Sequence, residues 1–184
     1  FTLSPTKEKD ALPYSHEQET ARPYYYAATM NGVKAEITAS ERCGIMRFTF
    51  DNPDEAYLKV RVNSDEHEGR IWLDTLRHAI FGQNPCHRIY QGKGQPTGTS
   101  GWLCVTYNAP IESYGKLDKQ TLWVKFKSTK QVLAKAACSF TGWEGAQKNL
   151  TKEIPSWDFD SVKLALADLW EEELGRITIG DYGR

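Results

Sequence analysis

Apolar side chains recur at every second position between residues 33 and 50, and this alternation most constrains the fold. The run 33–39 reads VKAEITA, and apolar residues alternate again over 46–50. Successive side chains of a β-strand point to opposite faces, so both runs predict half-buried strands. Asn31-Gly32 precedes the first run and favours a tight hairpin, because both residues tolerate positive φ. With an aromatic strand at 24–26, this stretch is predicted to be a meander of three antiparallel strands.

The same reasoning predicts a β-sandwich for the first 140 residues. Residues 1–14 are expected to be an extended lead-in, 83–100 a long surface loop rich in Gly and Pro, and 111–120 a connection between strands. About nine strands without intervening helices indicate an antiparallel sandwich. Beyond the meander, the expected strands are 58–62, 70–75, 77–82, 102–107, 122–126 and 132–140.

The pattern changes to helical after residue 140. Thr141 and Glu144 have the spacing of a capping box, which predicts a short helix ending near Glu153. A second helix of about 18 residues is expected from Asp158, with Asp158 or Asp160 as its cap. Its apolar stripe must be buried against the sandwich or against a further domain. The stripe consists of Phe159, Val162, Leu166, Leu169, Trp170, Leu174 and Ile177.

The predicted fold class is therefore mainly β. An antiparallel β-sandwich in residues 1–140 is followed by two C-terminal linker helices in 141–184. The chain begins with Phe rather than Met, and we expect it to be processed, cloned as a fragment or only partly represented.

Composition argues against two classes of partner. The formal net charge is -1, and the charges are mixed along the sequence, so nucleic acid is not an expected partner. No apolar run reaches the roughly 18 residues that a membrane span needs. Aromatic residues make up 12% of the chain, which is compatible with stacking on sugars and equally with filling a sandwich core.

The four cysteines do not predict a metal site. None belongs to a CxxC pair, which argues against bound zinc. Cys104 and Cys138 lie in strand-like runs and are predicted to be buried free thiols. In an exported protein one disulfide is also possible, with three connectivities open.

One dense polar cluster stands out as a candidate site. His16, Glu17 and Glu19 lie close together before the aromatic strand. On a regular strand the two glutamates would face one side, about 6.6–6.8 Å apart. An inverting pair of carboxylates is separated by roughly 6.5–9.5 Å, although two glutamates at this spacing are common by chance. Three interpretations therefore remain open: a solvated strand entrance, a ligand contact and a complete catalytic pair.

Other polar residues give weaker signals. Arg42 follows the second strand of the meander, and its ordinary role would be an ion pair with Glu41 or Glu36. His67 and His78 are isolated, so each is expected to be a surface or packing histidine.

Several of these motifs together resemble a known family. The ordered match is similar to the N-terminal domain of glycoside hydrolase family 92, the exo-acting α-mannosidases. Tyr24 is a departure, because the family usually has glycine at this position. The matching residues are Ser15-His16-Glu17-x-Glu19-x-Ala21-x-Pro23, Tyr25-Tyr26, Ala35-Glu36-Ile37-Thr38-Ala39, Arg42, Arg47-Phe48-Thr49-Phe50, Ser139-Phe140, Ala146-x-Lys148-Asn149-Leu150, Glu153-Ile154-Pro155, Trp157-Asp158-Phe159-Asp160 and Trp170.

The resemblance implies a function and indicates which domain supplies the catalytic residues. The family hydrolyses α-mannosidic linkages, as in N-glycans, with inversion and with calcium. Its site lies between the sandwich and a C-terminal (α/α)₆ barrel, and the barrel supplies the catalytic acid, the base and most calcium ligands. The resemblance therefore implies that this chain carries no catalytic or metal-binding residue and is inactive by itself. It also implies that the chain needs the helical barrel as its partner. The expected location is outside the cytoplasm, in the periplasm or secreted.

The residues that match the family motif are the candidate substrate contacts. These are His16, Glu17, Glu19 and Arg42. They could instead brace the interface between the two domains. Two alternatives to an enzyme part stay open: a stand-alone carbohydrate-binding sandwich using aromatic residues of 83–102, and a structural module without a ligand.

Overall fold

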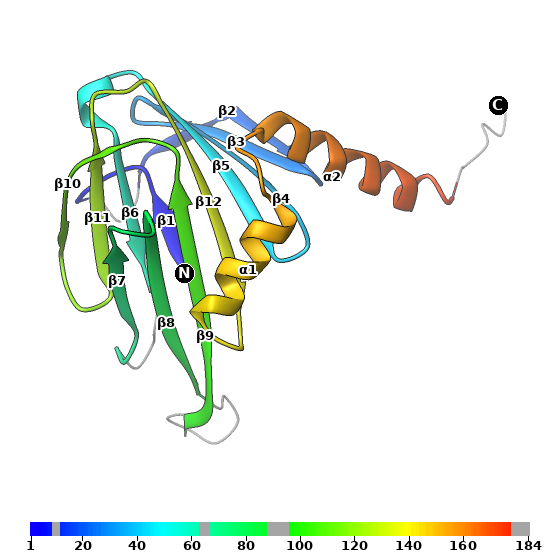
Figure 1. The fold of residues 1–184 in the computed structure, drawn as a ribbon. Helices are drawn as coiled ribbons and strands as arrows, with labels where there is room; N and C mark the ends of the chain where they lie inside the picture. Colours follow the sequence, from blue (N-terminus) through cyan, green and yellow to red (C-terminus); the bar gives the residue numbers. More distant parts are fainter. Residues whose placement is uncertain (9–11, 63–66, 88–95, 178–184) are drawn as a thin grey trace, which may run out of the picture.

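Two antiparallel β-sheets face one another, and two helices follow them at the C-terminal end (Figure 1). The computed structural model describes residues 1–8, 12–62, 67–87 and 96–177. The prediction of a mainly-β antiparallel sandwich with two C-terminal helices is confirmed. The elements are β1 (Thr2–Ser4), β2 (Tyr14–Arg22), β3 (Tyr25–Met30), β4 (Val33–Ala39), β5 (Cys43–Phe50), the 3₁₀ helix η1 (Pro53–Glu55), β6 (Tyr57–Arg61), β7 (Arg70–Asp74), β8 (Ala79–His87), β9 (Pro96–Tyr107), β10 (Ile111–Lys116), β11 (Thr121–Phe126), β12 (Gln131–Ser139), α1 (Trp143–Glu153) and α2 (Phe159–Leu174).

The two sheets differ in width. Within the described residues, the small sheet has the order β1-β6-β11-β10, and the large sheet has the order β2-β3-β4-β5-β12-β9-β8-β7. The predicted meander forms β3, β4 and β5, which pair in sequence order. Its first hairpin turns at Asn31 and Gly32, whose φ angles are 49° and 79°. The Asn-Gly prediction is therefore confirmed.

The main core lies between the sheets and follows the period-two pattern. Met46 and Phe48 of β5 face inward, as do Val132 and Ala134 of β12. They meet side chains of the small sheet that solvent does not reach, among them Phe126. Burial of these apolar groups is the dominant favourable term that holds the sheets together.

A second core lies on the outer face of the large sheet, under α1. Ile45 and Phe81 point to this side and pack with Ala146, Leu150 and Ile154. Both faces of the central strands are therefore covered, which explains why the large sheet contains uninterrupted apolar runs such as residues 103–105.

The large sheet extends beyond the small one on its β2 side. By register, Tyr26, Ile37 and Met46 occupy one row of the inner face. Met46 is 8% exposed, whereas Tyr26 and Ile37 are 38% and 41% exposed. The inner face of β2–β4 is thus a partly apolar surface that the small sheet leaves open, and we call this surface the overhang.

Some predicted loops are strands. The expected loop 83–100 is wrong in its described parts, because β8 continues to His87 and β9 begins at Pro96; residues 88–95 lie outside the described residues. Residues 111–116, expected to be part of a connection, form β10, and the lead-in contains β1 and the start of β2. In each case backbone hydrogen bonds to a neighbouring strand hold the segment in place. Its side chains show no clear alternation, so the sequence did not predict a strand.

The helix caps give one correction and one confirmation. Thr141 does not cap α1: the N-cap is Gly142, without a side-chain cap bond, because the helix begins one residue later than the capping box requires. The Thr141 hydroxyl instead lies 2.9 Å from the Ser139 hydroxyl. Asp158 does cap α2, since its Oδ1 accepts a hydrogen bond from the Ser161 N–H at 3.0 Å.

The cysteine prediction is half right. Cys104 is a buried free thiol, but Cys138 is an exposed one, so its prediction is wrong. Cys138 is the next-to-last residue of β12, where the strand emerges from the core. Burial raises the pKa of the Cys104 thiol to about 12, which keeps it protonated and unreactive.

Candidate functional site

The predicted polar cluster lies on the overhang. His16 Nδ1 is 2.6 Å from Glu19 Oε2, and the Tyr26 hydroxyl also hydrogen-bonds the Glu19 carboxylate. The Tyr26 bond, followed by the His16 bond, holds the pKa of Glu19 below its usual value. The same carboxylate raises the pKa of Tyr26 to about 12. We call these three residues the overhang cluster.

The overhang cluster combines ionic and aromatic groups at an exposed surface. The His16 side chain is 85% exposed, while that of Glu19 is only 21% exposed. The ring of Tyr14 meets the His16 ring edge-on, with centroids 5.3 Å apart. A hydrogen-bonded carboxylate and imidazole beside tyrosine rings can bind hydroxyl groups and an apolar ring face together.

Glu17 is placed differently from the prediction. The register of β2 on β3 shifts between Tyr14 and Glu19, so a bulge contains His16 and Glu17. The spacing of a regular strand therefore does not apply to Glu17 and Glu19. The Glu17 backbone N–H bonds the Ser15 hydroxyl at 3.3 Å, and Glu17 itself is exposed.

Arg42 is not part of the overhang cluster. It lies in the turn between β4 and β5, where its Nε donates to Glu153 Oε1 at 2.6 Å and its backbone N–H to Glu153 Oε2 at 2.9 Å. The Ser40 hydroxyl adds a third bond to Glu153 at 2.7 Å. Of the expected partners, Glu41 approaches Arg42 only to 4.0 Å, and Glu36 pairs with Arg47.

The contacts of Glu153 connect the last residue of α1 to the large sheet. Burial alone would raise the pKa of Glu153, but the three bonds from Arg42 and Ser40 lower it to about 2. Lys135 of β12 supports the same region, because its Nζ donates to the Ile154 carbonyl at 2.9 Å and lies 4.1 Å from the Trp157 ring centroid. The segment that leaves α1 is therefore fixed on the sheet.

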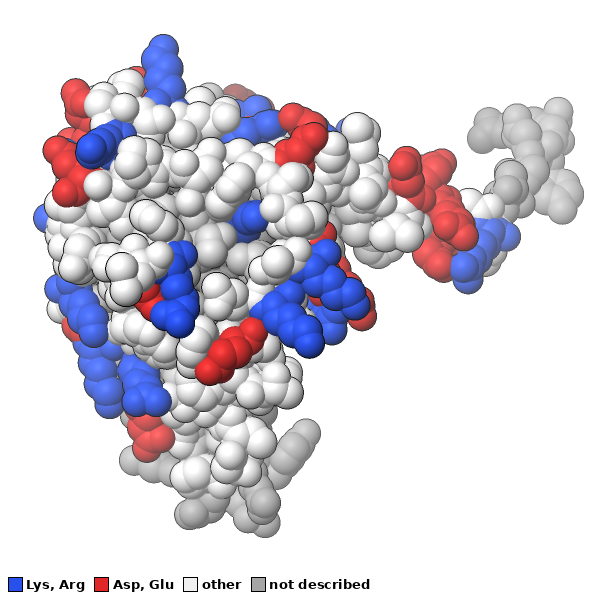
Figure 2. Space-filling model, in the orientation of Figure 1, with Lys and Arg blue, Asp and Glu red and all other residues white. Residues whose placement is uncertain are grey.

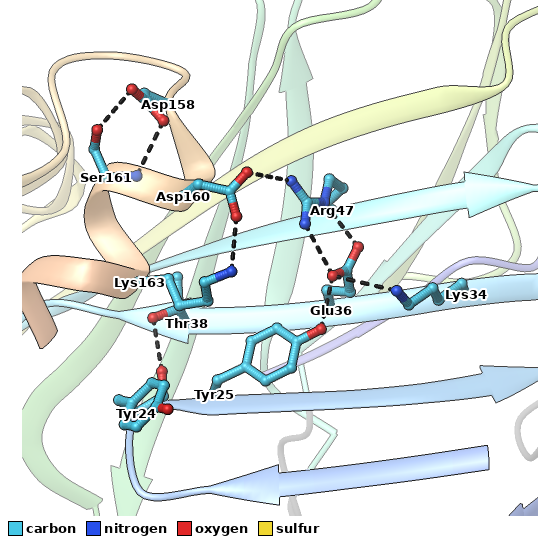
Figure 3. Close-up of polar contacts among 10 residues, drawn as sticks. All are labelled: Tyr24, Tyr25, Lys34, Glu36, Thr38, Arg47, Asp158, Asp160, Ser161 and Lys163. Atoms are coloured by element: carbon cyan, nitrogen blue, oxygen red, sulfur yellow. Dashed lines mark hydrogen bonds and ion pairs between the residues drawn. The ribbon is translucent and has the colours of Figure 1, made fainter. Parts of the chain in front are cut away.

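A polar network that the sequence did not reveal joins α2 to the outer face (Figure 3). Glu36 and Arg47 form two hydrogen bonds, of 2.7 and 2.9 Å. Arg47 also donates to Asp160 at 2.9 Å, and Asp160 accepts from Lys163 at 2.8 Å. The Tyr25 hydroxyl donates to Glu36 at 2.7 Å. We call these five residues the α2 anchor.

Burial makes the α2 anchor a strong contact. The Glu36 side chain is 6% exposed, and the bond from Arg47 is the main reason why its pKa falls to about 2. Burial raises the pKa of Tyr25 to about 12, and its bond to Glu36 adds to the rise. Arg47 also lies over the Phe159 ring, 4.3 Å from its centroid. Two-point arginine–carboxylate pairs of this kind fix geometry as well as charge.

Within the part of the chain that the structure describes, α2 is buried at its start and exposed further along. Phe159 is 2% exposed, whereas Leu169, Trp170 and Leu174 are 59%, 40% and 60% exposed. Figure 1 shows α2 projecting away from the sheets, and Figure 2 shows acidic side chains gathered towards its far end. Among the described residues, no helix is long and apolar enough to cross a membrane.

The described residues offer no preformed metal centre. Within them, no group of three or more His, Cys, Asp and Glu side chains could hold a metal ion. Calcium prefers six to eight oxygen ligands, and the overhang cluster supplies a single carboxylate already engaged by His16 and Tyr26. The chemistry that this surface supports directly is hydrogen bonding to a polar ligand.

Comparison with known proteins places these features in a family context. A sequence model of the glycosyl hydrolase family 92 N-terminal domain matches residues 2–150. A model of the glycosyl hydrolase family 92 catalytic domain matches residues 145–183. Both matches include part of α1, and the second includes all of α2.

Related proteins are much longer than this chain. An uncharacterized secreted glycosidase of Arthroderma benhamiae is 23% identical over 217 residues, which cover 97% of this chain and 28% of the relative. A family GH92 inverting mannosidase of Bacteroides thetaiotaomicron superposes with a TM-score of 0.79 at 21% identity, covering 97% of this chain and 26% of that one. A family GH92 alpha-mannosidase of the same organism gives 0.69 at 22% identity, covering 92% and 25%. The structural likeness at these identities supports the fold, and the chain spans about a quarter of each relative.

Proposed function

The chain belongs to glycosyl hydrolase family 92, as the sequence resemblance indicated, and from this premise we propose that it is the N-terminal part of an exo-acting α-mannosidase. The observation that carries the proposal is the pair of consecutive family matches, to the N-terminal domain over 2–150 and to the catalytic domain over 145–183. Two structural neighbours that share the sandwich are mannosidases. The proposed substrate is an α-mannoside at the end of a glycan.

In this proposal the chemistry lies outside the described residues. Inversion requires one carboxylic acid to protonate the leaving oxygen and one base to activate a water molecule. Calcium would help to hold and distort the sugar, with most of its ligands outside this chain. The role that this chain takes is to bind, orient and support.

We assign the substrate-facing role to the overhang. The Glu19 carboxylate would accept hydrogen bonds from sugar hydroxyls, the His16 ring would add a further hydrogen bond, and the Tyr26 hydroxyl holds the Glu19 carboxylate in place. Glu17, exposed in the β2 bulge, could reach the same ligand. Arg42 keeps its candidate role only through the part of its side chain that is exposed, because Glu153 already binds its Nε.

The partner in this proposal is the helical-barrel part of the catalytic domain. The catalytic-domain match begins in α1 and continues through α2, so the exposed stripe of α2 belongs to the matched region. Leu169, Trp170 and Leu174 would be covered by further helices of that domain. The α2 anchor would then fix the angle at which the barrel meets the sandwich.

A location outside the cytoplasm fits the same proposal. The Arthroderma relative is described as a secreted glycosidase, which supports this location. The proposed location is therefore periplasmic or secreted.

Hydrolysis of p-nitrophenyl α-mannoside tests the proposed function. The 184-residue chain should release no nitrophenol, whereas a polypeptide that also contains the whole catalytic domain should do so and should lose activity with a calcium chelator. In that longer protein Glu19→Gln should raise KM about tenfold, as expected for one lost charged hydrogen bond. Asp54→Asn, on the exposed η1 turn, is the matched control and should leave KM unchanged.

Two results would overturn the proposal. One is an inactive longer protein that binds mannosides, which would indicate a carbohydrate-binding module instead. The other is hydrolysis by the 184-residue chain itself that disappears in Glu17→Gln, because the chemistry would then lie within this chain.

A further inference from the structure

A pocket lies at the opposite side of the sandwich from the overhang. It has a volume of about 580 Å³ and opens where the end of β9, the start of β10 and the turn between β7 and β8 meet. Its lining includes Thr75, His78, Tyr107, Ile111 and Tyr114. β2 and β7 are the two edges of the large sheet, so this pocket is separate from the overhang cluster.

Tyr107 gives this pocket a feature that ordinary surface hollows lack. Its side chain is 6% exposed, and its ring packs edge-on against Phe126, with centroids 5.4 Å apart. Its buried hydroxyl has no hydrogen-bond partner in the part of the chain that the structure describes. Burial raises the pKa of this hydroxyl to about 12, so it stays a neutral donor and acceptor. A buried hydroxyl without a partner costs stability unless something satisfies it.

The rest of the lining combines apolar surfaces with hydrogen-bonding groups. Pro110, Ile111 and the half-exposed ring of Tyr114 offer apolar contact. Thr75 and Ser113 offer hydroxyl groups at the same pocket. Such a mixture suits a ligand that has an apolar ring face and several hydroxyl groups.

The charges around the pocket favour a neutral ligand. His78 and Lys127 provide potential positive charge, and Glu112 provides a negative one. The Glu112 carboxylate is held by Lys125 at 2.8 Å. With both signs at the rim, neither an anion nor a cation is favoured as strongly as a neutral polyhydroxylated molecule.

We propose that the pocket between β7–β8 and β10 binds one neutral pyranose unit of an oligosaccharide, with Tyr114 against the sugar ring and Tyr107 as the partner of a sugar hydroxyl. Because the Tyr107 hydroxyl is buried, the proposed contact also requires the side chains at the rim to shift when the sugar binds. The site would hold glycan independently of the overhang and of hydrolysis. The inference therefore does not depend on the proposed mannosidase activity, and a binding measurement on this chain can fail or succeed without regard to catalysis.

Isothermal titration calorimetry on the 184-residue chain tests the proposal, with α-1,2-mannobiose, cellobiose and inorganic phosphate as probes. At least one disaccharide should bind with a millimolar Kd, and phosphate should not compete. In a Glu19→Gln background, which weakens mannoside binding at the overhang, Tyr114→Ala should abolish the remaining signal, and Tyr107→Phe should weaken it at least about fivefold. Trp170→Ala removes an exposed aromatic ring on α2 and should leave the Kd unchanged.

Thermal unfolding separates a binding role of Tyr107 from a structural one. Tyr107→Phe keeps the ring and removes only the unpartnered hydroxyl, so the melting temperature should stay the same or rise. A lower melting temperature would show that the hydroxyl already has a partner in the folded chain and would overturn the assignment. Absence of disaccharide binding, binding unchanged in both tyrosine variants, or displacement by phosphate would overturn it as well.

Discussion

Glu36 is the residue on which the attachment of α2 depends most directly. It is buried on the outer face, where it accepts two hydrogen bonds from Arg47 and one from Tyr25. Lys34 adds a weaker contact at 3.5 Å. A buried carboxylate is tolerated only when its charge is paired and its oxygens are bonded. Glu36 is therefore tolerated in the sheet because charged and polar groups surround it on the outer face, while the adjacent Ala35 and Ile37 face the other side.

The pKa of Glu36 leads to a pH-dependent prediction. Its pKa is about 2 in the folded chain against an ordinary value of 4.5, so its charged form stabilises the fold above pH 4.5. This contribution is lost as the pH falls from 4.5 towards 2. Glu36→Gln should lower the free energy of unfolding at pH 7 by an amount on the order of 2–3 kcal/mol.

Urea unfolding of both proteins between pH 2 and pH 7 provides the measurement. The difference between Glu36→Gln and the parent should shrink as the pH falls below 4.5, whereas Glu41→Gln, at an 82% exposed side chain, should follow the parent throughout. A difference that stays constant with pH would show that Glu36 contributes through packing rather than through its charge.

At the scale of elements, alternation in the sequence identified the strands whose two faces differ. β4, with apolar residues at every second position, was predicted to within a residue, whereas the alternation over 46–50 missed the first three residues of β5. β2 and β10 escaped prediction because almost every residue in them is exposed, so no alternation marks them. Edge and surface strands are held by backbone pairing, which a single sequence does not display.

The candidate site was predictable only where its members are close in sequence. His16 and Glu19 are three residues apart, and the structure joins them as the predicted cluster implies. Arg42 and Glu153 are 111 residues apart, and Arg47 and Asp160 are 113 apart. Partners at such separations follow from the packing of helices on the sheet. The Glu36–Arg47 pair was easier to predict from the sequence, because the register of the β4–β5 hairpin places the two residues directly opposite each other.

The docking of α2 predicts a local effect of Arg47→Met. The variant removes the bonds to Glu36 and Asp160 and the contact with Phe159. Because it leaves a buried carboxylate without its main partner, we expect a loss of about 3–5 kcal/mol of stability. Hydrogen exchange should show faster amide exchange over 159–163, with β9 and β12 still protected.

A matched control separates loss of the anchor from loss of charge. Lys34→Met removes a 52% exposed cation that also contacts Glu36, but it does not touch α2. Its exchange pattern over 159–163 should equal that of the parent. If Arg47→Met leaves these amides equally protected, α2 is held by Phe159 alone.

At the scale of the whole molecule, the chain is a β-sandwich whose C-terminal helices are held on the large sheet by hydrogen bonds and ion pairs. Arg42 and Lys135 hold the end of α1, and Arg47 holds the start of α2. Beyond that point the helix carries its apolar stripe into solvent. The division at residue 140 remains a prediction, since the two family matches overlap over 145–150 within α1. What the contacts show is that the helices and the large sheet pack as one body near that boundary.

The last prediction concerns the exposed stripe of α2. In the 184-residue chain, Leu169→Gln combined with Trp170→Gln should change the melting temperature by no more than about 2 °C, because exposed substitutions cost little. The same pair should reduce binding of a hydrophobic dye and improve solubility. Removal of residues 156–184 should instead lower the melting temperature, because it also takes away buried Phe159 and the Asp160 partner of Arg47.

In a polypeptide that contains the whole catalytic domain, the double substitution should become clearly destabilising, since the stripe would then be buried. An equal, small effect in both proteins would mean that nothing covers this face, and the proposed role of α2 as the connection to the barrel would have to be abandoned.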